Sequence, residues 1–304
     1  MRPVSRGSLR AQEQRLAYLF LALPLAIILL VIVFPTFWNI ILSFHKVGLR
    51  DLRTFSFSDL NYTLYSYHKV LSDPDFPRAL VATLIYSLGG TAITLLLGLG
   101  AALLLNPAFP GRGMLRGVFL LPYIAPIVAV TFTWRLLLDP RGPIMTALIN
   151  AGWLNHPFHL LGQRPWAMFT VILFQGWRYF PLAFLFILAR LQAIPEDLYE
   201  AAEVDGATPF QKFFYITLPQ LKLVLATLGF LRFMWTFNKF DDVYLLTSGA
   251  AGTKVLPVLV VDYLIGEFDI GAGAAAAMVL FGCLALLLFL YFKFVMRRAE
   301  QVEV

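Results

Sequence analysis

Long apolar stretches without charge are the feature that most limits how this chain can fold. Four such stretches lie at residues 16–45, 79–111, 117–134 and 270–292, and each approaches or exceeds the ~20 apolar residues that a bilayer-spanning helix needs. Across the 304 residues, 59% are hydrophobic and only 14% are charged, well below the charged share of a soluble protein. The sequence therefore predicts an all-α integral membrane protein that crosses the bilayer several times.

Six membrane-spanning helices fit the pattern of apolar residues. We expect them at about 16–43, 79–105, 113–136, 166–190, 221–247 and 270–294. The fourth helix contains Arg178, and the fifth contains Arg232 and Lys239. A charge inside a span is costly unless it has a function or a partner. The prediction is a six-helix domain at residues 16–298, preceded by an N-terminal segment at 1–15.

The distribution of Lys and Arg predicts how these helices are oriented. The segments on one side hold 12 Lys and Arg, and the segments on the other side hold only 7 in a greater length. The richer side comprises residues 1–15, 106–116, 190–222 and 293–304, and the poorer side comprises 44–77, 139–165 and 248–270. Because the richer side marks the cytoplasm, both termini are predicted to be cytoplasmic. The net charge of +6 is ascribed to topology and to anionic membrane lipid, not to nucleic acid.

The cytoplasmic loop at residues 191–222 carries helix signals that a simple tether between spans would not need. Acidic residues begin a first helix, and Gly206 ends it, because glycine adopts the left-handed conformation without steric cost. Thr208 and Gln211 form the T-x-x-Q pattern of a capping box. A second helix is expected to start there and to end before Pro219. The loop is therefore predicted to be a compact helix–turn–helix.

The same loop resembles a known family. The EAA signature of ABC importer permeases is matched by Glu200-Ala201-Ala202, Gly206 and Ile216-x-Leu218-Pro219, and the adjoining DGA and QKF resemble the carbohydrate-importing branch. The resemblance extends over nearly the whole chain, which is similar to the first permease subunit of the maltose and glycerol-3-phosphate importers. One departure is the stretch 248–253, where that branch usually has a glycine-rich segment with proline.

The resemblance implies the type I ABC importer transmembrane fold and a set of partners. These are a second homologous permease, a cytoplasmic ABC ATPase dimer and an extracytoplasmic solute-binding protein, in the cytoplasmic membrane of a prokaryote. It also implies that the loop couples to the ATPase through Glu200, Ala201, Ala202, Asp205, Gly206, Ile216, Leu218 and Pro219. The alternative is an amphipathic helix on lipid headgroups. Residues 196–205 hold five acids and no base, whereas an interfacial helix is usually basic.

Polar and aromatic residues in the fourth and fifth spans form a candidate substrate site. Its members are Gln175, Trp177, Arg178, Tyr179, Trp235, Asn238, Lys239 and Asp241. Sugars are bound by hydrogen bonds to hydroxyls and by aromatic rings against their C–H faces, and polar groups within membrane spans usually line pathways. The alternative is that Arg178 pairs with Asp241 or Asp242 and that the aromatic residues only pack.

Other chemistry finds little support in the sequence. Residues 249–254 lack the Gly-Lys adjacency of a phosphate loop. His156 and His159 have no nearby acidic or thiol companion, and Cys283 is the single cysteine, so we expect no metal site. No cofactor and no catalysis are predicted.

We therefore predict a permease subunit of an ATP-driven importer for a di- or oligosaccharide. Import of glycerol-3-phosphate or another polyol phosphate is the nearest alternative, with Arg178, Arg232 and Lys239 as anion ligands. An integral-membrane transferase that uses Asp241 and Asp242 as metal ligands is the alternative from another class. A secondary transporter is less favoured, because such folds usually carry an internal repeat.

Overall fold

The computed structural model describes residues 6–51 and 62–293, and helices dominate them. Five of these helices are long and apolar enough to cross a membrane, and a bent pair forms a sixth candidate span. The described residues fall into two compact units. The first unit joins the chain up to Ser72 with Val260–Cys283, and the second unit joins Asp73–Leu259 with the rest. The six-span, all-α prediction is confirmed.

The first span is one helical rod in which the side chains of residues 15–37 are almost all exposed. It consists of α1 (Arg6–Ile28), the π turn η1 (Leu29–Val33) and α2 (Phe34–Ser43). Pro35 is the second residue after the π turn. Proline removes a backbone donor and crowds the preceding turn, which explains a wider turn there. Within Arg15–Ser43, the most apolar window buries none of its residues. Such a helix suits contact with lipid or with another subunit.

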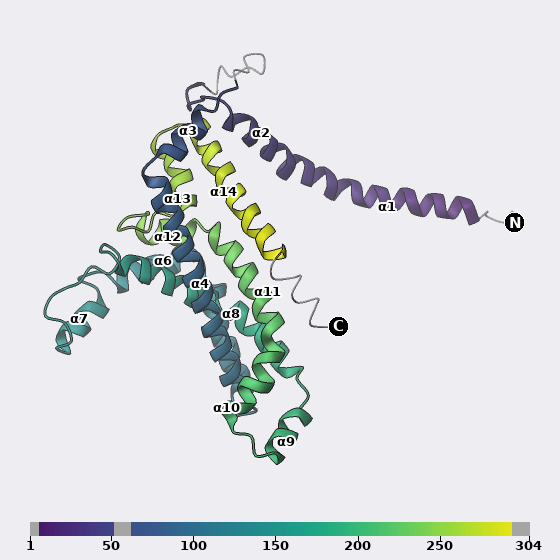
Figure 1. The fold of residues 1–304 in the computed structure, drawn as a ribbon, viewed down its shortest axis with the longest axis vertical. Coiled ribbons are helices and arrows are strands. Elements are labelled where there is room, and N and C mark those ends of the chain that lie inside the picture. The colour runs from purple at the N-terminus through teal and green to yellow at the C-terminus, as the bar shows by residue number, and fades with distance from the viewer. Residues whose placement is uncertain (1–5, 52–61, 294–304) are drawn as a thin grey trace. The chain divides into compact units, whose positions relative to one another are not determined.

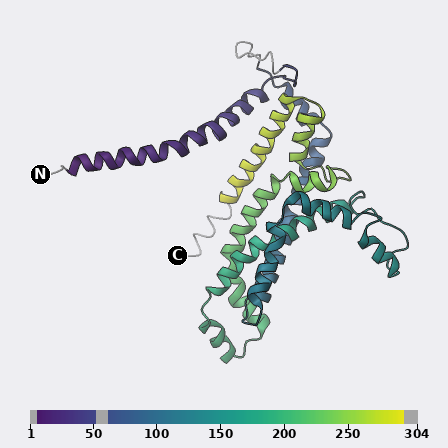
Figure 2. The same cartoon turned by 180° about the vertical axis from the view of Figure 1, so that it is seen from behind.

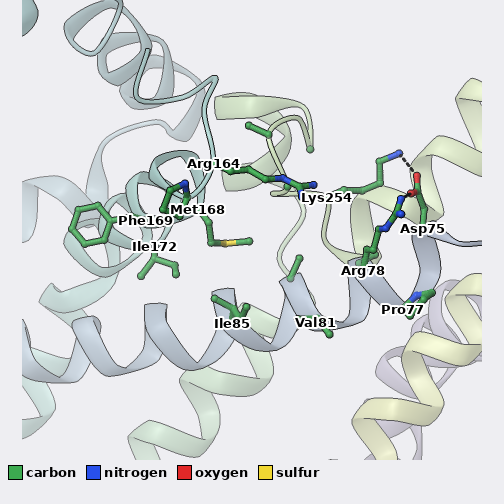
Figure 3. Close-up of a pocket in the computed structure, with 16 residues that line it drawn as sticks. Asp75, Pro77, Arg78, Val81, Ile85, Arg164, Met168, Phe169, Ile172 and Lys254 are labelled. Atoms are coloured by element: carbon green, nitrogen blue, oxygen red, sulfur yellow. Dashed lines mark hydrogen bonds and ion pairs between the residues drawn. The ribbon is translucent and has the colours of Figure 1, made fainter. Parts of the chain in front are cut away.

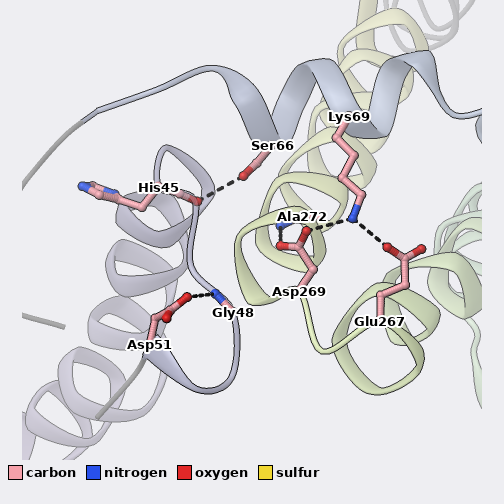
Figure 4. Close-up of polar contacts among 8 residues, drawn as sticks. All are labelled: His45, Gly48, Asp51, Ser66, Lys69, Glu267, Asp269 and Ala272. Atoms are coloured by element: carbon pink, nitrogen blue, oxygen red, sulfur yellow. Dashed lines mark hydrogen bonds and ion pairs between the residues drawn. The ribbon is translucent and has the colours of Figure 1, made fainter. Parts of the chain in front are cut away.

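A short bridge and a charge cluster hold the remainder of the first unit together. It contains α3 (Tyr65–Ser72), the π turn η4 (Asp262–Gly266) and the start of α14 (Ile270–Tyr291). Gly48 pairs with Asp269 in an isolated bridge. Lys69 Nζ lies 2.6 Å from Glu267 Oε2 and 2.8 Å from Asp269 Oδ2, and Figure 4 shows this side chain pointing towards both acids. These contacts join segments about 200 positions apart in the sequence.

Removing the Lys69 ammonium group is expected to loosen this unit. We expect Lys69→Met to destabilise it by about 1–2 kcal/mol, because one charge-assisted bond is half-buried and the other is exposed. Burial lowers the pKa of Lys69, but hydrogen bonds and charges from Asp269 and Glu267 outweigh it and raise the pKa to about 12.

A raised pKa means that the stabilisation is complete below the ordinary value of 10.5 and is lost as pH rises through about 12. The effect of Lys69→Met should therefore be equal at pH 6 and pH 9, as measured by hydrogen exchange of α3. Lys69→Arg keeps the charge and serves as the control. An effect that changes strongly between these pH values would contradict this assignment.

Three long helices lie side by side in the second unit (Figures 1 and 2). They are α4 (Asp75–Leu105), α8 (Trp166–Gln192) and α11 (Leu218–Phe237). α4 approaches the backbone of α8 at Gly98, where an added Cβ would lie 3.0 Å from the backbone nitrogen of Phe184. Small residues permit such close packing between membrane helices. Buried residues of these three helices form the main apolar core.

The third span is broken, although the sequence predicted a single helix at 113–136. It consists of α5 (Arg112–Ile124) and α6 (Ile127–Leu137), which meet at a 92° bend. Pro126 disfavours helical geometry at the residue before it, and Ala125 is extended with ψ of 142°. After α6 follows the short α7 (Pro143–Asn150).

The fifth span also differs from its predicted limits. The chain leaves α8, forms α9 (Asp197–Val204), and then runs through α10 (Pro209–Lys212) and the π turn η3 (Phe213–Thr217) directly into α11. Pro219 was expected to end the second loop helix. It instead lies at the start of α11, just after a π turn that accommodates its missing donor. The span ends at Phe237, and α12 (Asp241–Thr247) and α13 (Leu256–Val261) follow.

Candidate functional site

The predicted turn of the loop between α8 and α11 is a complete Schellman motif. Gly206 has a φ of +77°, which is the left-handed conformation that glycine adopts most readily. Its N–H donates to Glu203 O at 3.0 Å, and the N–H of Ala207 donates to Ala202 O at 2.8 Å. This pair of bonds satisfies the last carbonyls of α9. The turn therefore fixes the direction of α9 relative to the helix that follows.

The capping box that begins the next helix is also present. The N–H of Thr208 donates to Gln211 Oε1 at 2.7 Å, and the N–H of Gln211 donates to Thr208 Oγ1 at 3.3 Å. Tyr199 of α9 contacts Thr217 through its hydroxyl at 2.9 Å. Arg190 at the end of α8 donates to Gln220 Oε1 at 2.6 Å. These bonds attach the loop to α8 and to the helix that becomes α11.

The residues assigned to coupling occupy two environments. Five of them are exposed: Glu200, Ala201, Asp205, Gly206 and Pro219. Three are half-buried, namely Ala202, and Ile216 and Leu218, which lie against the apolar core or beside it. Three apolar side chains of the loop are exposed: Val204 at 89%, Phe210 at 73% and Tyr215 at 79%. The exposure of Phe210 and Tyr215 was not predicted from the sequence. We name the exposed part of residues 197–215 the end surface. Exposed apolar side chains around acidic ones are typical of a protein-binding surface.

Tyr179 is the centre of the polar cluster between the long helices. Its ring lies 4.3 Å from the guanidinium carbon of Arg232 and 5.4 Å from Lys239 Nζ, distances at which cations are attracted to an aromatic face. Its hydroxyl donates to Asp242 Oδ1 at 3.4 Å. Tyr86 of α4 donates to the other oxygen of Asp242 at 3.0 Å. The buried carboxylate of Asp242 is thus held by two phenols.

Gln175 joins the three long helices through neutral hydrogen bonds. It is fully buried, and it accepts from Thr94 of α4 at 3.3 Å and donates to Thr236 of α11 at 2.7 Å. Gly90 faces it at a distance that leaves no room for a Cβ. Buried amides are stable in a membrane protein when their hydrogen bonds are made internally. Gln175 therefore has a structural role at this position.

Arg178 holds the bend of the third span. Its Nη1 donates to the carbonyl of Pro122 at 3.1 Å, and its Nη2 donates to that of Ala125 at 2.9 Å. These are carbonyls at the end of α5, where a cation also complements the helix dipole. The pairing with Asp241 or Asp242 that the sequence left open is not among its ion pairs in the described residues. Backbone carbonyls at the end of a proline-broken helix accept the hydrogen bonds of Arg178, in place of the carboxylate considered in that alternative.

The other predicted members lie around this centre in different ways. Trp177 packs against Trp134 and Phe174 with its ring tilted to theirs, at ring distances of 5.4 and 6.4 Å. Trp235 is 52% exposed, Asn238 and Asp241 are exposed, and Lys239 contacts Asp241 at 3.3 Å. The cluster therefore has a buried half and an accessible half.

Sequence reasoning missed several members of the cluster. Tyr86, Thr94 and Thr236 come from helices whose facing sides could not be assigned from one sequence. Asp242 was considered beside Asp241, but only the structure shows that the first is buried and the second exposed. The spacing of four between Arg232 and Thr236 was the one available signal, because such residues share a helix face.

The cluster combines accessible aromatic and amide groups with buried donors. The Nε atoms of Arg178 and Arg232 are buried and have no hydrogen-bond partner among the described residues. Buried donors of this kind favour a ligand or solvent that offers oxygen acceptors. No group of three His, Cys, Asp or Glu side chains in the described part of the chain is placed to hold a metal ion.

Several apolar spans, an exposed helix pair at one end and a polar cluster between the spans define a multi-pass membrane transport subunit. The chain belongs to the family described as the binding-protein-dependent transport system inner membrane component, which matches residues 94–301. Members of this family are the permease components of transport systems.

Relatives with assigned names agree with this family. The chain is 34% identical over 272 residues to the trehalose/maltose transport system permease protein MalF of Thermococcus litoralis, covering 88% of this chain and 89% of that protein. It is 29% identical over 289 residues to the trehalose transport system permease protein SugA of Mycobacterium tuberculosis, covering 95% and 91%. The lactose transport system permease protein LacF of Rhizobium radiobacter is 29% identical over 253 residues, covering 83% of each.

Solved structures show the same fold. A chain of a bacterial ABC transporter involved in the import of the acidic polysaccharide alginate superposes with a TM-score of 0.78, covering 97% of this chain and 99% of that one at 22% identity. A bacterial alginate ABC transporter in complex with an alginate-bound periplasmic protein gives a TM-score of 0.80 at 20% identity, covering 96% and 98%. The predicted family and fold class are therefore confirmed.

Proposed function

We propose that this chain is the permease subunit of an ATP-driven sugar importer and forms half of its translocation pore. The observation that carries the proposal is the joining of the end surface to the polar cluster. The helix from Pro209 to Phe237 is a single 29-residue run, which spans about 43 Å at 1.5 Å per residue. A displacement at the Gly206 turn is thereby transmitted to Arg232, near the other end of this helix.

The proposed partners follow from the surfaces and from the relatives. We assign the end surface to a cytoplasmic ABC ATPase, the uncovered first span to lipid or a second homologous permease, and the opposite end to a solute-binding protein. Among the solved relatives, one is a transporter in complex with a periplasmic protein. The orientation proposed from Lys and Arg places both termini and the end surface in the cytoplasm. The chain itself performs no catalysis in this proposal.

The proposed substrate is a neutral di- or oligosaccharide. The relatives named above are permeases for trehalose, maltose and lactose. Trp235 and Asn238 are accessible, and an aromatic face with an amide suits a sugar ring and its hydroxyls. A phosphate ester is less suited, because Arg178 is bonded to carbonyls and Lys239 is paired with Asp241. We therefore favour the sugar over glycerol-3-phosphate.

Sugar import is tested with the complete complex, purified with its ATPases, second permease and binding protein and placed in liposomes. At least one di- or oligosaccharide in a panel should be taken up and should stimulate ATP hydrolysis. Trp235→Ala should lower the uptake of that sugar up to about tenfold, because an aromatic contact of this kind is worth ~0.5–1.5 kcal/mol. Trp153, which is 79% exposed in a loop, provides the control Trp153→Ala.

The opposite pattern would remove the proposal. Stimulation by glycerol-3-phosphate and by none of the sugars would assign a polyol phosphate instead. Purification of the chain as an active enzyme without ATPase or second permease would place it in another class. Equal losses in Trp235→Ala and Trp153→Ala would show that the accessible half of the cluster does not recognise the sugar.

A further inference from the structure

A separate open pocket lies in the second unit, at the end farthest from the Gly206 turn. Its volume is about 960 Å³, and it is lined by the first turns of α4 and α8 and by the loop at 249–254 (Figure 3). α8 starts at this pocket and ends 27 residues later beside α9, so the two sites are about 40 Å apart along the helix. None of the residues that line the pocket belongs to the polar cluster or to the end surface.

The rim of this pocket is predominantly basic. Arg78, Arg164 and Lys254 line it, and Asp75 is the single acidic residue among the lining residues. Asp75 contacts Arg78 and Lys254, each at 3.3 Å. Asp75 is shared by Arg78 and Lys254, and Arg164 forms no ion pair among the described residues, so the rim offers positive charge that favours an anion.

Arg164 is held at the rim without a carboxylate partner. Among the described residues it forms no ion pair, and its guanidinium lies against Gly252, where an added Cβ would be 2.9 Å from its central carbon. Gly252 has a φ of +81°, so glycine is favoured there both by backbone conformation and by the close arginine. Figure 3 shows the Arg164 side chain extending across the pocket towards the loop that carries Lys254.

Below the rim, the pocket is apolar and continues along two membrane spans. Val81 and Ile85 of α4 and Phe169 of α8 line it and are 55%, 50% and 53% exposed. α4 and α8 are both long and apolar enough to cross the bilayer. The exposed apolar floor therefore runs from the interface into the hydrocarbon, with the cations at headgroup level.

We propose that this pocket binds an anionic glycerophospholipid of the bilayer leaflet at this end of the spans. The phosphate is bound by Arg164 together with Arg78 and Lys254, and an acyl chain lies along Val81, Ile85 and Phe169. Arginine's planar fork suits a phosphate, and basic side chains at the end of a span attract an anionic group at the membrane surface. The inference rests on the proposed function only in requiring that these spans lie in a membrane.

The test uses the complete transporter complex, delipidated in detergent and titrated with phosphatidylglycerol or with phosphatidylcholine of identical acyl chains. Bound lipid is counted by native mass spectrometry. The complex should bind phosphatidylglycerol at least fivefold more tightly than phosphatidylcholine. Arg164→Gln should lower the affinity for phosphatidylglycerol about fivefold, as expected for one basic residue. Arg141→Gln, at an exposed arginine outside the pocket lining, should leave the affinity unchanged.

Two further arms identify the ligand. Ile85→Trp fills the apolar floor without altering charge and should weaken binding of both lipids. Millimolar glycerol phosphate should not displace phosphatidylglycerol, because it lacks the acyl chain. Displacement by glycerol phosphate, equal binding of the two lipids, or unchanged affinity in Arg164→Gln would each overturn the proposal. So would lipid binding by the isolated chain but not by the complex, which would assign the pocket to a subunit interface. No transported substrate is needed, so failure of sugar import leaves this test intact.

Discussion

Gly206→Val is expected to abolish most ATP-driven uptake while the permease still inserts and assembles. The φ of +77° at Gly206 costs an L-residue ~1–2 kcal/mol, and a β-branched residue is disfavoured further. No atom lies within 4 Å of an added Cβ, so the penalty falls on the backbone conformation and not on packing. The turn should then relax, and α9 should point in another direction.

The matched control at this position is Gly206→Asn. Asparagine tolerates the left-handed conformation, and the open space accommodates its side chain. We expect it to retain most uptake. Transport and ATP hydrolysis are measured together in liposomes, and the Val variant should lose their coupling. Normal uptake by the Val variant, or its absence from the membrane, would show that the turn does not aim the coupling helix.

Gly98→Val should strongly destabilise the second unit. An added Cβ at Gly98 would meet both the Cβ of Ala183 and the backbone nitrogen of Phe184. A backbone atom cannot rotate away, so α4 and α8 must separate along the interface that contains the main core. Overpacking typically costs ~1–3 kcal/mol, and we expect the upper end of that range or more. The yield of assembled complex and its thermal stability in detergent provide the measurement.

Gly100→Val is the control for this substitution. It lies two residues further along the same helix, and nothing lies within 4 Å of its added Cβ. Both variants carry the same change in helix propensity, so their difference reports the contact with α8 alone. Similar stability of the two variants would mean that α4 and α8 do not approach each other as the structure places them.

The spans and the loop turn could be predicted because each depends on local sequence. A charge-free run of sufficient length must cross the bilayer whatever its neighbours are. The Gly206 turn and the Thr208 capping box depend on residues within a few positions of each other, and both form as predicted. The match to the family then identified what kind of membrane protein these elements build.

The parts that could not be predicted depend on partners distant in the sequence. Pro126 and Pro219 both lie in largely apolar segments of the sequence. Pro126 lies at the 92° break of the third span, whereas Pro219 lies inside a continuous helix after a π turn. At the break before Pro126, two carbonyls accept hydrogen bonds from Arg178, which lies 52 positions further along the chain. A single sequence does not tell which faces of the helices contact each other. It therefore could not show that Arg178 donates to backbone carbonyls and not to Asp242.

The Tyr86–Asp242 bond has a consequence for biosynthesis. The two residues are 156 positions apart, so α4 enters the membrane long before its partner has been translated. Until α12 arrives, the phenol of Tyr86 lies in or near hydrocarbon without its acceptor, a state that costs free energy. The backbone N–H of Leu256 likewise finds its acceptor in the earlier helix, where it donates to Thr83 Oγ1 at 2.8 Å. Hydrogen bonds of polar residues in an early helix are thus completed within the bilayer only after the later part of the chain has been synthesised and has folded against it.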